Sequence, residues 1–339
     1  MNPLLRAACA AFLLLAGLAP AAAQDGAAFY RGKQIRLIVG TAAGQDYDIW
    51  ARLIARHLGR HIPGNPTFVV ENMPGGGHII ATNYLFNIAA KDGSVLGMVT
   101  RNITDDAILN FPNVRFEPAK FTWIGSPEIN HRGLFAASGT GIEHAQQLFD
   151  KELVVGATGA GQAVTTAPIL LKNVLGMKLK IVLGYHAPQD IVLAMERGEV
   201  GGLVDSVGAA NGQRREWVRS GKMRLLFTME QGKLSWADVP TVFDFVKAEE
   251  QRQIFTFLAS SMELGRPLLA PPGVPADRVA VLRRAFDATM QDPAFLKEAG
   301  GLGFEVTAQN GEEIERKVKA AMATPREIAD EAERAAAQN

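Results

Sequence analysis

Strand-like and helix-like segments alternate along most of this chain of 339 residues. Residues 34–40, QIRLIVG, form a short apolar run rich in β-branched side chains. Apolar residues then repeat at helical spacing: Ile49, Trp50, Leu53, Ile54 and Leu58. Two such series, over residues 34–100 and 153–230, predict an α/β protein with two similar lobes. In each lobe we expect a mostly parallel sheet flanked by helices, because strands joined through helices run parallel.

Positive and negative side chains balance in this sequence. Lysine and arginine together number 35, as do aspartate and glutamate. No run of five like charges occurs, so the sequence has no basic segment of the kind that binds nucleic acid. We therefore expect no nucleic-acid partner.

The first 23 residues have the three-part order of a signal peptide. Arg6 supplies the charged start, residues 7–18 the apolar run, and three alanines the small residues before a cleavage site near Ala23. We expect export to the periplasm; the alternative is a buried N-terminal helix. No later segment reaches the ~20 apolar residues of a membrane-spanning helix. The only cysteine, Cys9, would leave with the signal peptide, so the mature chain is expected to have no disulfide and no thiolate metal site.

Three glycine-rich loops each join a predicted strand to a predicted helix. They span residues 40–48, 74–78 and 156–162. The first backbone N–H groups of a helix are unpaired, and glycine lets an anion approach them. In open parallel sheets such loops lie at the carboxyl ends of the strands, where ligands bind. Any strand-to-helix turn favours glycine, but three such loops from both lobes favour anion binding in a cleft.

The third loop leaves an enzyme as the alternative. Its sequence, VVGATGAGQ, resembles the glycine fingerprint of short-chain dehydrogenases, yet the spacing is G-x-x-G-x-G instead of G-x-G-x-x-G. No acidic residue ends the next strand to bind a ribose, and no Tyr-x-x-x-Lys pair is present. We therefore predict a protein that is not an enzyme and uses no cofactor. The alternative is an exported, Rossmann-like NAD(P)-dependent oxidoreductase.

Two histidines, His57 and His61, stand four residues apart on a predicted helix, a spacing that can hold a metal ion. No glutamate completes an H-E-x-x-H pattern, and further ligands are missing. We interpret the pair as solvated surface side chains and expect no metal site.

Six segments between residues 29 and 320 follow one another in the order of a known family. They are FYRGKQIRLIVGTAAGQDYDIWARLIARHL, VVENMPGGGHIIATNYLFNIAAKDGSVLGMV, GATGAGQ, GYHAPQDIVLAMERGEVGGLVDS, DVPTVFDF and LLAPPGVPADRVAVLRRAF. Together they resemble the substrate-binding proteins of tripartite tricarboxylate transporters, also called Bug receptors. Members of that family share a G-G-x-x-D loop, an E-N-x-P-G-A-G segment and a Y-K-G-x-x-P segment.

The resemblance implies a two-lobed periplasmic-binding-protein fold of type II, with a ligand cleft between lobes that two crossing strands join. Lobe I would comprise residues 29–126 and 262–325, and lobe II residues 127–261. The alanine-rich end, residues 326–339, is expected to be a flexible tail. The implied function is that of an extracytoplasmic receptor for a small organic acid. Its implied partners are the membrane subunits of a tripartite transporter or a sensor, and we expect a monomer.

In this family the first two loops and hydroxyl groups of the third loop hold the carboxylate of the ligand. The resemblance assigns ligand contacts in this chain by position: Ala43, Gly44, Gln45, Asp46, Tyr47 and Asp48 in the first loop; Gly75, Gly76, Gly77 and His78 in the second; Thr158, Gly159, Gly161, Gln162 and Thr165 in the third; and Tyr185 and Asp205 on the opposite wall.

The first loop departs from the family pattern, because Gln45 and Asp46 stand where the family has two glycines. Asp48 precedes the first periodic apolar residue and is predicted to be the N-cap of a helix starting at Ile49. Asp46 is then free, and we predict that it faces the cleft and accepts a hydrogen bond from a donor beside the acid group of the ligand. A solvated loop aspartate is the alternative.

Overall fold

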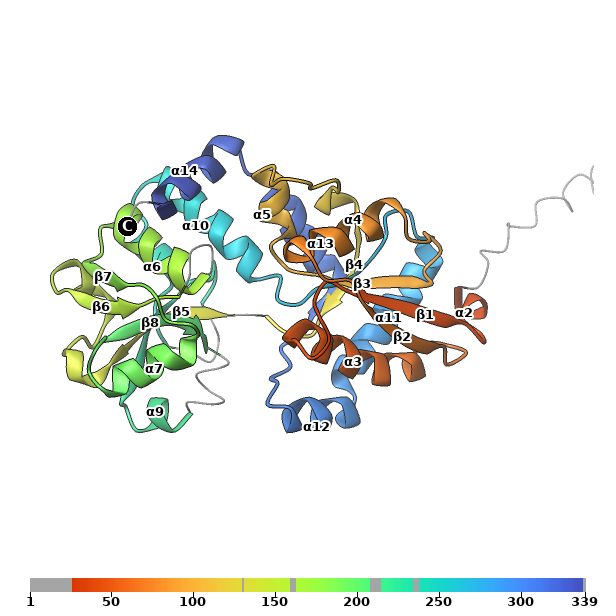
Figure 1. The fold of residues 1–339 in the computed structure, drawn as a ribbon, viewed down its shortest axis with the longest axis horizontal. Coiled ribbons are helices and arrows are strands. Elements are labelled where there is room, and N and C mark those ends of the chain that lie inside the picture. Colours follow the sequence, from red (N-terminus) through yellow and green to blue (C-terminus); the bar gives the residue numbers. More distant parts are fainter. Residues whose placement is uncertain (1–25, 130, 159–162, 208–214, 234–237, 338–339) are drawn as a thin grey trace, which may run out of the picture.

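The structure is a computed structural model that describes residues 26–129, 131–158, 163–207, 215–233 and 238–337. The described residues form two sheets, and Figure 1 shows them in two bodies that lie side by side. We call the body around the six-stranded sheet lobe I and the body around the five-stranded sheet lobe II. The predicted signal peptide, residues 1–23, lies outside the described residues.

The sheet of lobe I is mixed. In spatial order its strands are β11 (Gln309–Asn310), β4 (Thr122–Ser126), β10 (Leu268–Ala270), β3 (Val95–Met98), β1 (Gln34–Val39) and β2 (Thr67–Asn72). β1 is parallel to β2 and β3. β10 is antiparallel to β3 and β4, and β11 is antiparallel to β4.

Helices cover both faces of this sheet. They are α2 (Gly26–Phe29), α3 (Asp46–Leu58), α4 (Ile79–Asn87), α5 (Ile103–Ile108), α11 (Ala276–Gln291), α12 (Pro293–Gly301) and α13 (Gly311–Met322), with 3₁₀ turns η1 (Gly59–His61), η2 (Gly76–His78) and η3 (Pro118–Lys120). Side chains alternate between the faces of a strand. In β1, Leu37 and Val39 therefore pack with α3, α11 and α12, whereas Ile38 packs with α4 and α13.

Lobe II repeats this arrangement around a second mixed sheet. Its strands in spatial order are β7 (Leu179–Val182), β6 (Leu153–Gly156), β8 (Gly202–Ser206), β5 (Arg132–Ala137) and β9 (Met223–Thr228). Its helices and turns are η4 (Ser138–Thr140), η5 (Ala145–Phe149), α6 (Ala163–Leu175), α7 (Pro188–Glu196), α9 (Arg215–Arg219), η6 (Val242–Phe245) and α10 (Glu249–Met262). In β5, Leu134 packs towards α6 and α10, and Phe135 towards α7.

The prediction of mostly parallel sheets is correct for only part of each sheet. β6 is parallel to β7 and β8, but β5 is antiparallel to β8 and β9. The chain crosses between the lobes at residues 127–131 and 263–267, directly before β5 and β10. The chain enters β5 and β10 directly from the other lobe and not through a helix of the same lobe. The expectation that strands joined through helices run parallel therefore does not apply to these two strands.

The chain ends in a helix, where a flexible tail was predicted. Helix α14 (Arg326–Ala337) packs on α6 and α10 of lobe II, as Figure 1 shows. Ala329, Ala332 and Ala335 are buried because they recur every third residue and form one narrow apolar face. These small side chains let α14 approach α6 and α10 closely. This apolar face was not predicted from the sequence, because residues 326–339 are rich in alanine and charged residues and contain few large apolar ones.

Candidate functional site

The first predicted loop ends earlier than expected. Helix α3 begins at Asp46, and Gln45 occupies the N-cap position in an extended conformation. The prediction that Asp48 is the N-cap is therefore wrong. Asp48 lies in the first turn of α3 and is almost fully buried. Ala43 and Gly44 are exposed at the tip of the loop.

The carboxylate of Asp48 holds the first loop in place. It accepts hydrogen bonds from the backbone N–H of Gly44 at 2.8 Å, from Arg52 Nε at 2.9 Å and from Asn72 Nδ2 at 2.9 Å. Burial alone would raise the pKa of Asp48, but these hydrogen bonds outweigh it and hold the pKa below its ordinary value. Asn72 ends β2, so this carboxylate joins the first loop to the strand that leads to the second loop.

Asp46 is not free, contrary to the prediction. Its carboxylate accepts a hydrogen bond from Arg266 Nε at 2.8 Å and pairs with the same guanidinium a second time. Arg266 also forms an ion pair with Glu128 and lies over the ring of Tyr47, 5.6 Å from its centroid. Because Arg266 and Glu128 belong to the two crossings between the lobes, Asp46 ties the first loop to both crossings.

The second loop has an unusual backbone. Gly75, Gly76 and Gly77 all have positive φ, at 134°, 56° and 61°, and His78 follows with φ 77°. Glycine adopts these values without strain, so the loop turns tightly into α4. The ring of His78 makes an edge contact with Tyr47, 4.9 Å between centroids. The structure therefore brings the first and second predicted loops together.

His78 is neutral at pH 7. Burial lowers the pKa of this side chain to about 4. Its Nδ1 atom is buried and has no hydrogen-bond partner among the described residues. A Cβ atom on Gly40 would overlap the His78 ring, so the end of β1 accommodates this ring only because residue 40 is glycine.

Lobe II contributes a second group of predicted residues. The hydroxyls of Thr158 and Thr165 lie 3.4 Å apart, and both residues are buried. The backbone N–H of Tyr185 donates to Ala157 at 3.3 Å, which places Tyr185 beside the start of the third loop. Asp205, on β8, is also buried. Gly159, Gly161 and Gln162 lie outside the described residues.

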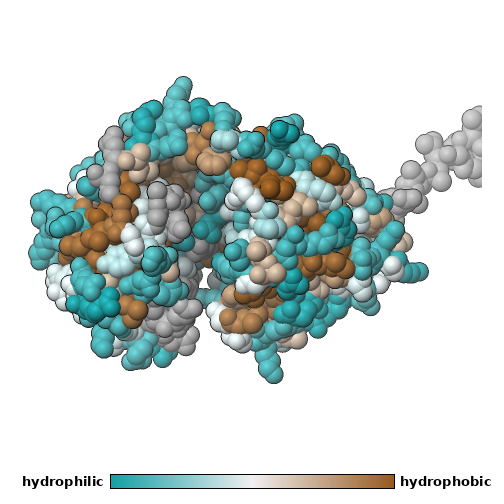
Figure 2. Space-filling view, in the orientation of Figure 1, coloured by the Kyte–Doolittle hydropathy of each residue, from teal (hydrophilic) through white to brown (hydrophobic). Residues whose placement is uncertain are grey.

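A pocket of about 680 Å³ lies between α5 of lobe I and helices α6, α10 and α14. Figure 2 shows the surface hollowed between the two lobes. None of the residues predicted by resemblance lines this pocket, but Val164 and Thr166 flank Thr165, and Pro188 follows Tyr185 by three residues. The pocket therefore adjoins the predicted site on its lobe II side.

Sequence reasoning missed the charged residues of this pocket. Arg101 follows β3, Asp106 lies on α5, and Arg132 begins β5. Burial lowers the pKa of Arg132 to about 10, and burial raises the pKa of Asp106 to about 6. The only sequence signal was position: Arg101 stands just beyond a predicted strand end, where parallel sheets bind ligands.

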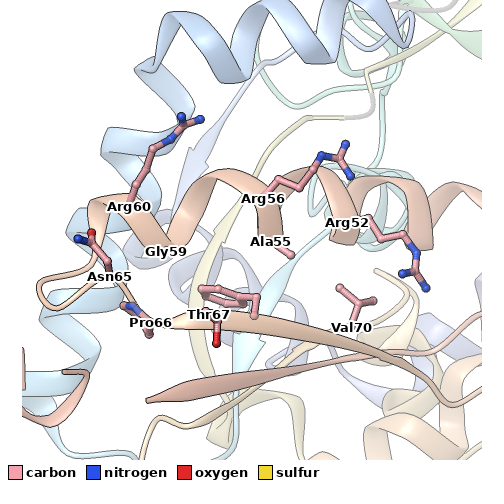
Figure 3. A pocket seen from close by; sticks show the side chains of 10 residues that line it. Arg52, Ala55, Arg56, Gly59, Arg60, Asn65, Pro66, Thr67 and Val70 are labelled. Atoms are coloured by element: carbon pink, nitrogen blue, oxygen red, sulfur yellow. The ribbon is translucent and has the colours of Figure 1, made fainter. Parts of the chain in front are cut away.

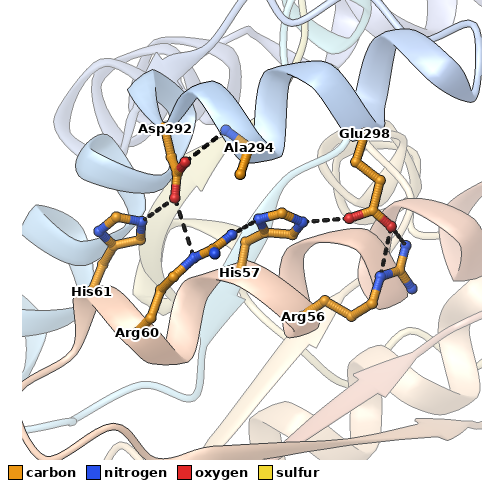
Figure 4. A network of polar contacts seen from close by, with 7 residues as sticks. All are labelled: Arg56, His57, Arg60, His61, Asp292, Ala294 and Glu298. Carbon is orange, nitrogen blue, oxygen red and sulfur yellow. Dashed lines mark hydrogen bonds and ion pairs between the residues drawn. The ribbon is translucent and has the colours of Figure 1, made fainter.

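The two helical histidines serve a structural role. His57 Nε2 lies 2.5 Å from Glu298 of α12, and His61 Nε2 lies 2.9 Å from Asp292. Figure 4 shows both contacts, together with pairing of Arg56 and Arg60 to the same two carboxylates. His57 is only 5% exposed, so the interpretation of a solvated pair is wrong for it. The partners lie more than 200 residues away and leave no local signal.

A second groove, of about 550 Å³, runs between α3 and β2 on the outside of lobe I. Figure 3 shows Arg52, Arg56 and Arg60 along this side of α3. Each of these arginines is already paired with a carboxylate, namely Asp48, Glu298 or Asp292. This groove therefore lacks an unpaired cation for an anionic ligand.

Two kinds of feature are missing from the part of the chain that the structure describes. No group of three or more His, Cys, Asp or Glu side chains there could hold a metal ion. No helix in the described ranges is both long enough and apolar enough to span a membrane.

Comparisons with known proteins identify the family and the fold. The sequence profile of a family described as "Tripartite tricarboxylate transporter family receptor" matches residues 51–333. A relative from Cupriavidus necator, "UPF0065 protein in gbd 5'region", is 25% identical over 319 residues, which are 91% of this chain and 90% of the relative. A TctC solute binding protein from Polaromonas, solved with no ligand, is similar in structure with a TM-score of 0.71 at 16% identity, over 89% of this chain and 99% of that one.

A solved structure with a ligand is also similar. MatC from Rhodopseudomonas palustris, with bound malate, has a TM-score of 0.55 at 20% identity, over 88% of this chain and 99% of that one. These likenesses confirm the predicted two-lobed periplasmic-binding-protein fold. The family match extends over most of the sequence, from within α3 to within α14, and covers strands of both sheets but not β1. The chain therefore belongs to the receptor family of the tripartite tricarboxylate transporters, which are extracytoplasmic solute-binding proteins.

Proposed function

We propose that this receptor captures a small organic acid between its lobes in the periplasm and delivers it to the membrane subunits of a tripartite tricarboxylate-type transporter. It acts as a monomer without catalysing a reaction, after removal of residues 1–23. Family membership supports the receptor role, and the malate bound to MatC supports a carboxylate ligand.

The contact between Tyr47 and His78 carries the proposal. It holds the first loop, before α3, against the second loop, before α4. Both loops then present helix N-termini and glycine backbone to the same space, which suits a carboxylate because unpaired N–H groups bind anions. In lobe II, the hydroxyls of Thr158 and Thr165 supply further donors.

Transport follows from closure of the lobes. A solute that contacts both lobes favours the closed arrangement, since only that arrangement makes both sets of contacts. The membrane subunits can then distinguish loaded from empty receptor by its shape. The lobes divide at the crossings, with residues 29–126 and 262–325 in lobe I and residues 127–261 in lobe II. Helix α14 is an addition to lobe II.

The test is the identity of the solute that the protein retains. Mature protein purified from the periplasm of its own host should release a small organic acid on denaturation, detected by mass spectrometry. The same acid, added back, should raise the melting temperature with increasing concentration. Recovery of a nicotinamide nucleotide instead would contradict the proposal and favour the oxidoreductase alternative.

A further inference from the structure

The pocket between α5 and helices α6, α10 and α14 contains two charged side chains without partners. The guanidinium of Arg132 makes no hydrogen bond or ion pair with a described residue, and its Nε and Nη1 atoms are buried. The carboxylate of Asp106 likewise makes neither contact within the described ranges, and the side chain is half-buried. Buried charged groups are normally hydrogen-bonded to a partner, and neither of these groups has such a partner among the described residues.

These two groups belong to different lobes. Asp106 lies on α5 of lobe I, and Arg132 begins β5 of lobe II. They do not pair with each other, although they line the same pocket. A ligand that carried both a negative and a positive charge could pair with Arg132 and Asp106 at once, and would thereby connect the lobes.

Charges of both signs surround Arg132. Glu230 Oε1 accepts the backbone N–H of Arg132 at 2.7 Å, so this carboxylate lies near the guanidinium without a hydrogen bond to it. Glu230 and Asp205 act on the charge of Arg132 from a distance, and Arg101 adds a second positive charge. Because neither carboxylate hydrogen-bonds to the guanidinium, a carboxylate in the pocket could still pair with Arg132, and Arg101 lines the same pocket from lobe I.

Most of the remaining wall of the pocket is apolar, although Asn102, Asp105, Thr166 and Glu333 also line it. The apolar part includes Leu109, Phe111, Phe257, Leu258, Met262 and Ala332. Phe111 is 54% exposed, so its ring is accessible to a ligand in the pocket. The body of a ligand in this pocket would lie against hydrocarbon and aromatic surface, and its affinity would rise with the apolar area that it buries.

We infer that this pocket binds a zwitterionic solute with an apolar body, such as an amino acid with a hydrocarbon side chain. Its carboxylate pairs with Arg132 and its ammonium group pairs with Asp106. The inference rests on the proposed function, because it concerns a solute bound between the lobes, but it assigns that solute to a pocket that none of the proposed carboxylate-binding loop residues lines.

Three matched probes test the two charges: L-leucine, 4-methylpentanoate, which lacks the amine, and 3-methylbutylamine, which lacks the carboxylate. Isothermal titration calorimetry on the mature protein should show leucine binding about 10- to 100-fold more tightly than either analogue, as expected for hydrogen bonds to charged groups. Glycine, which lacks the apolar body, should bind more weakly than leucine.

Variants of Asp106 and Arg132 test which charged group of the ligand each residue binds. Asp106→Asn should lower the affinity for leucine to that for 4-methylpentanoate and leave the affinity for 4-methylpentanoate unchanged. Arg132→Met should weaken leucine and 4-methylpentanoate at least tenfold, and Arg132→Lys should restore part of that loss. Glu327→Gln, an exposed change on α14 outside the pocket, is the control and should change neither affinity.

The outcomes separate this inference from the proposed function. If the organic acid retained from the host binds, but Asp106→Asn and Arg132→Met alter no affinity, the inference is wrong and the receptor function stands. Equal weakening of leucine and 4-methylpentanoate by Asp106→Asn would also overturn it. If no organic acid is retained and no probe binds, the proposed function itself is contradicted.

Discussion

Asp46, in the first loop, and Arg266, in the second crossing between the lobes, form a two-point ion pair although 220 residues separate them. Asp46 is one of the two positions at which the first loop was predicted to depart from the family pattern. Glu128, in the first crossing, shares the same guanidinium. The loop that is proposed to hold the ligand is thereby connected to both segments that cross between the lobes.

This arrangement predicts that Arg266 matters more for stability than Asp46. Asp46 is 49% exposed, whereas Arg266 is 15% exposed and serves two carboxylates. Asp46→Asn should lower the free energy of unfolding by at most about 1 kcal/mol, as for an exposed pair. Arg266→Met should lower it by about 1–3 kcal/mol, because Glu128 and Asp46 lose their shared donor. Urea unfolding at pH 7 measures the free energy of unfolding of both variants. Equal losses in the two variants would contradict the role of Arg266 as the shared partner of Asp46 and Glu128.

Asp48 should contribute more to the free energy of unfolding than a helix N-cap does. Asp48→Ala removes the acceptor of three hydrogen bonds, so we expect a loss of about 2–4 kcal/mol instead of the ~1 kcal/mol of a cap. The pKa of Asp48 is held below its ordinary value in the folded protein. Its contribution is therefore present above a pH of about 4 and is lost as the pH falls through the folded pKa. Unfolding curves of both proteins should converge at low pH; a constant difference would contradict this.

His78 should make the free energy of unfolding depend on pH, in a range above that of Asp48. Its pKa falls from 6.5 to about 4 on folding, so the unfolded chain binds the proton first. Stability should be unaffected above pH 6.5 and should fall by roughly 3 kcal/mol between pH 6.5 and pH 4. His78→Asn, a residue that tolerates the positive φ of this position, should remove that slope. If the stability of His78→Asn still fell between pH 6.5 and pH 4, another titrating group would be responsible for the pH dependence.

The sequence was sufficient for the fold class, the family and the pairing of the first two loops, and insufficient for the side-chain partners. Glycines 75–77 stand in a local motif, so their position in a tight turn before a helix could be predicted. The roles predicted for Asp46 and Asp48 were wrong, because both lie in the first turn of α3 and neither is its N-cap. Their difference comes from Arg266 and Asn72, which only the tertiary fold brings to them.

Binding should depend on the backbone of the second loop. Gly76 has φ 56°, and a β-branched side chain there would strain the loop and cover its N–H groups. Gly76→Val should abolish the rise in melting temperature caused by the acid recovered from the host. Gly303→Val is the matched control, since Gly303 also has positive φ, at 78°, and open space around it. Normal ligand-induced stabilisation in Gly76→Val would place the site elsewhere.

Capture of the solute between the lobes is the central claim, and hydrogen–deuterium exchange of the mature protein with and without the recovered acid tests it most directly. The account predicts slower exchange at the same ligand concentration in peptides from both lobes: those that cover residues 43–48 and 75–78 in lobe I, and those that cover the start of α6 and Tyr185 in lobe II. Protection confined to one lobe, or protection along the outer groove between α3 and β2, would contradict it.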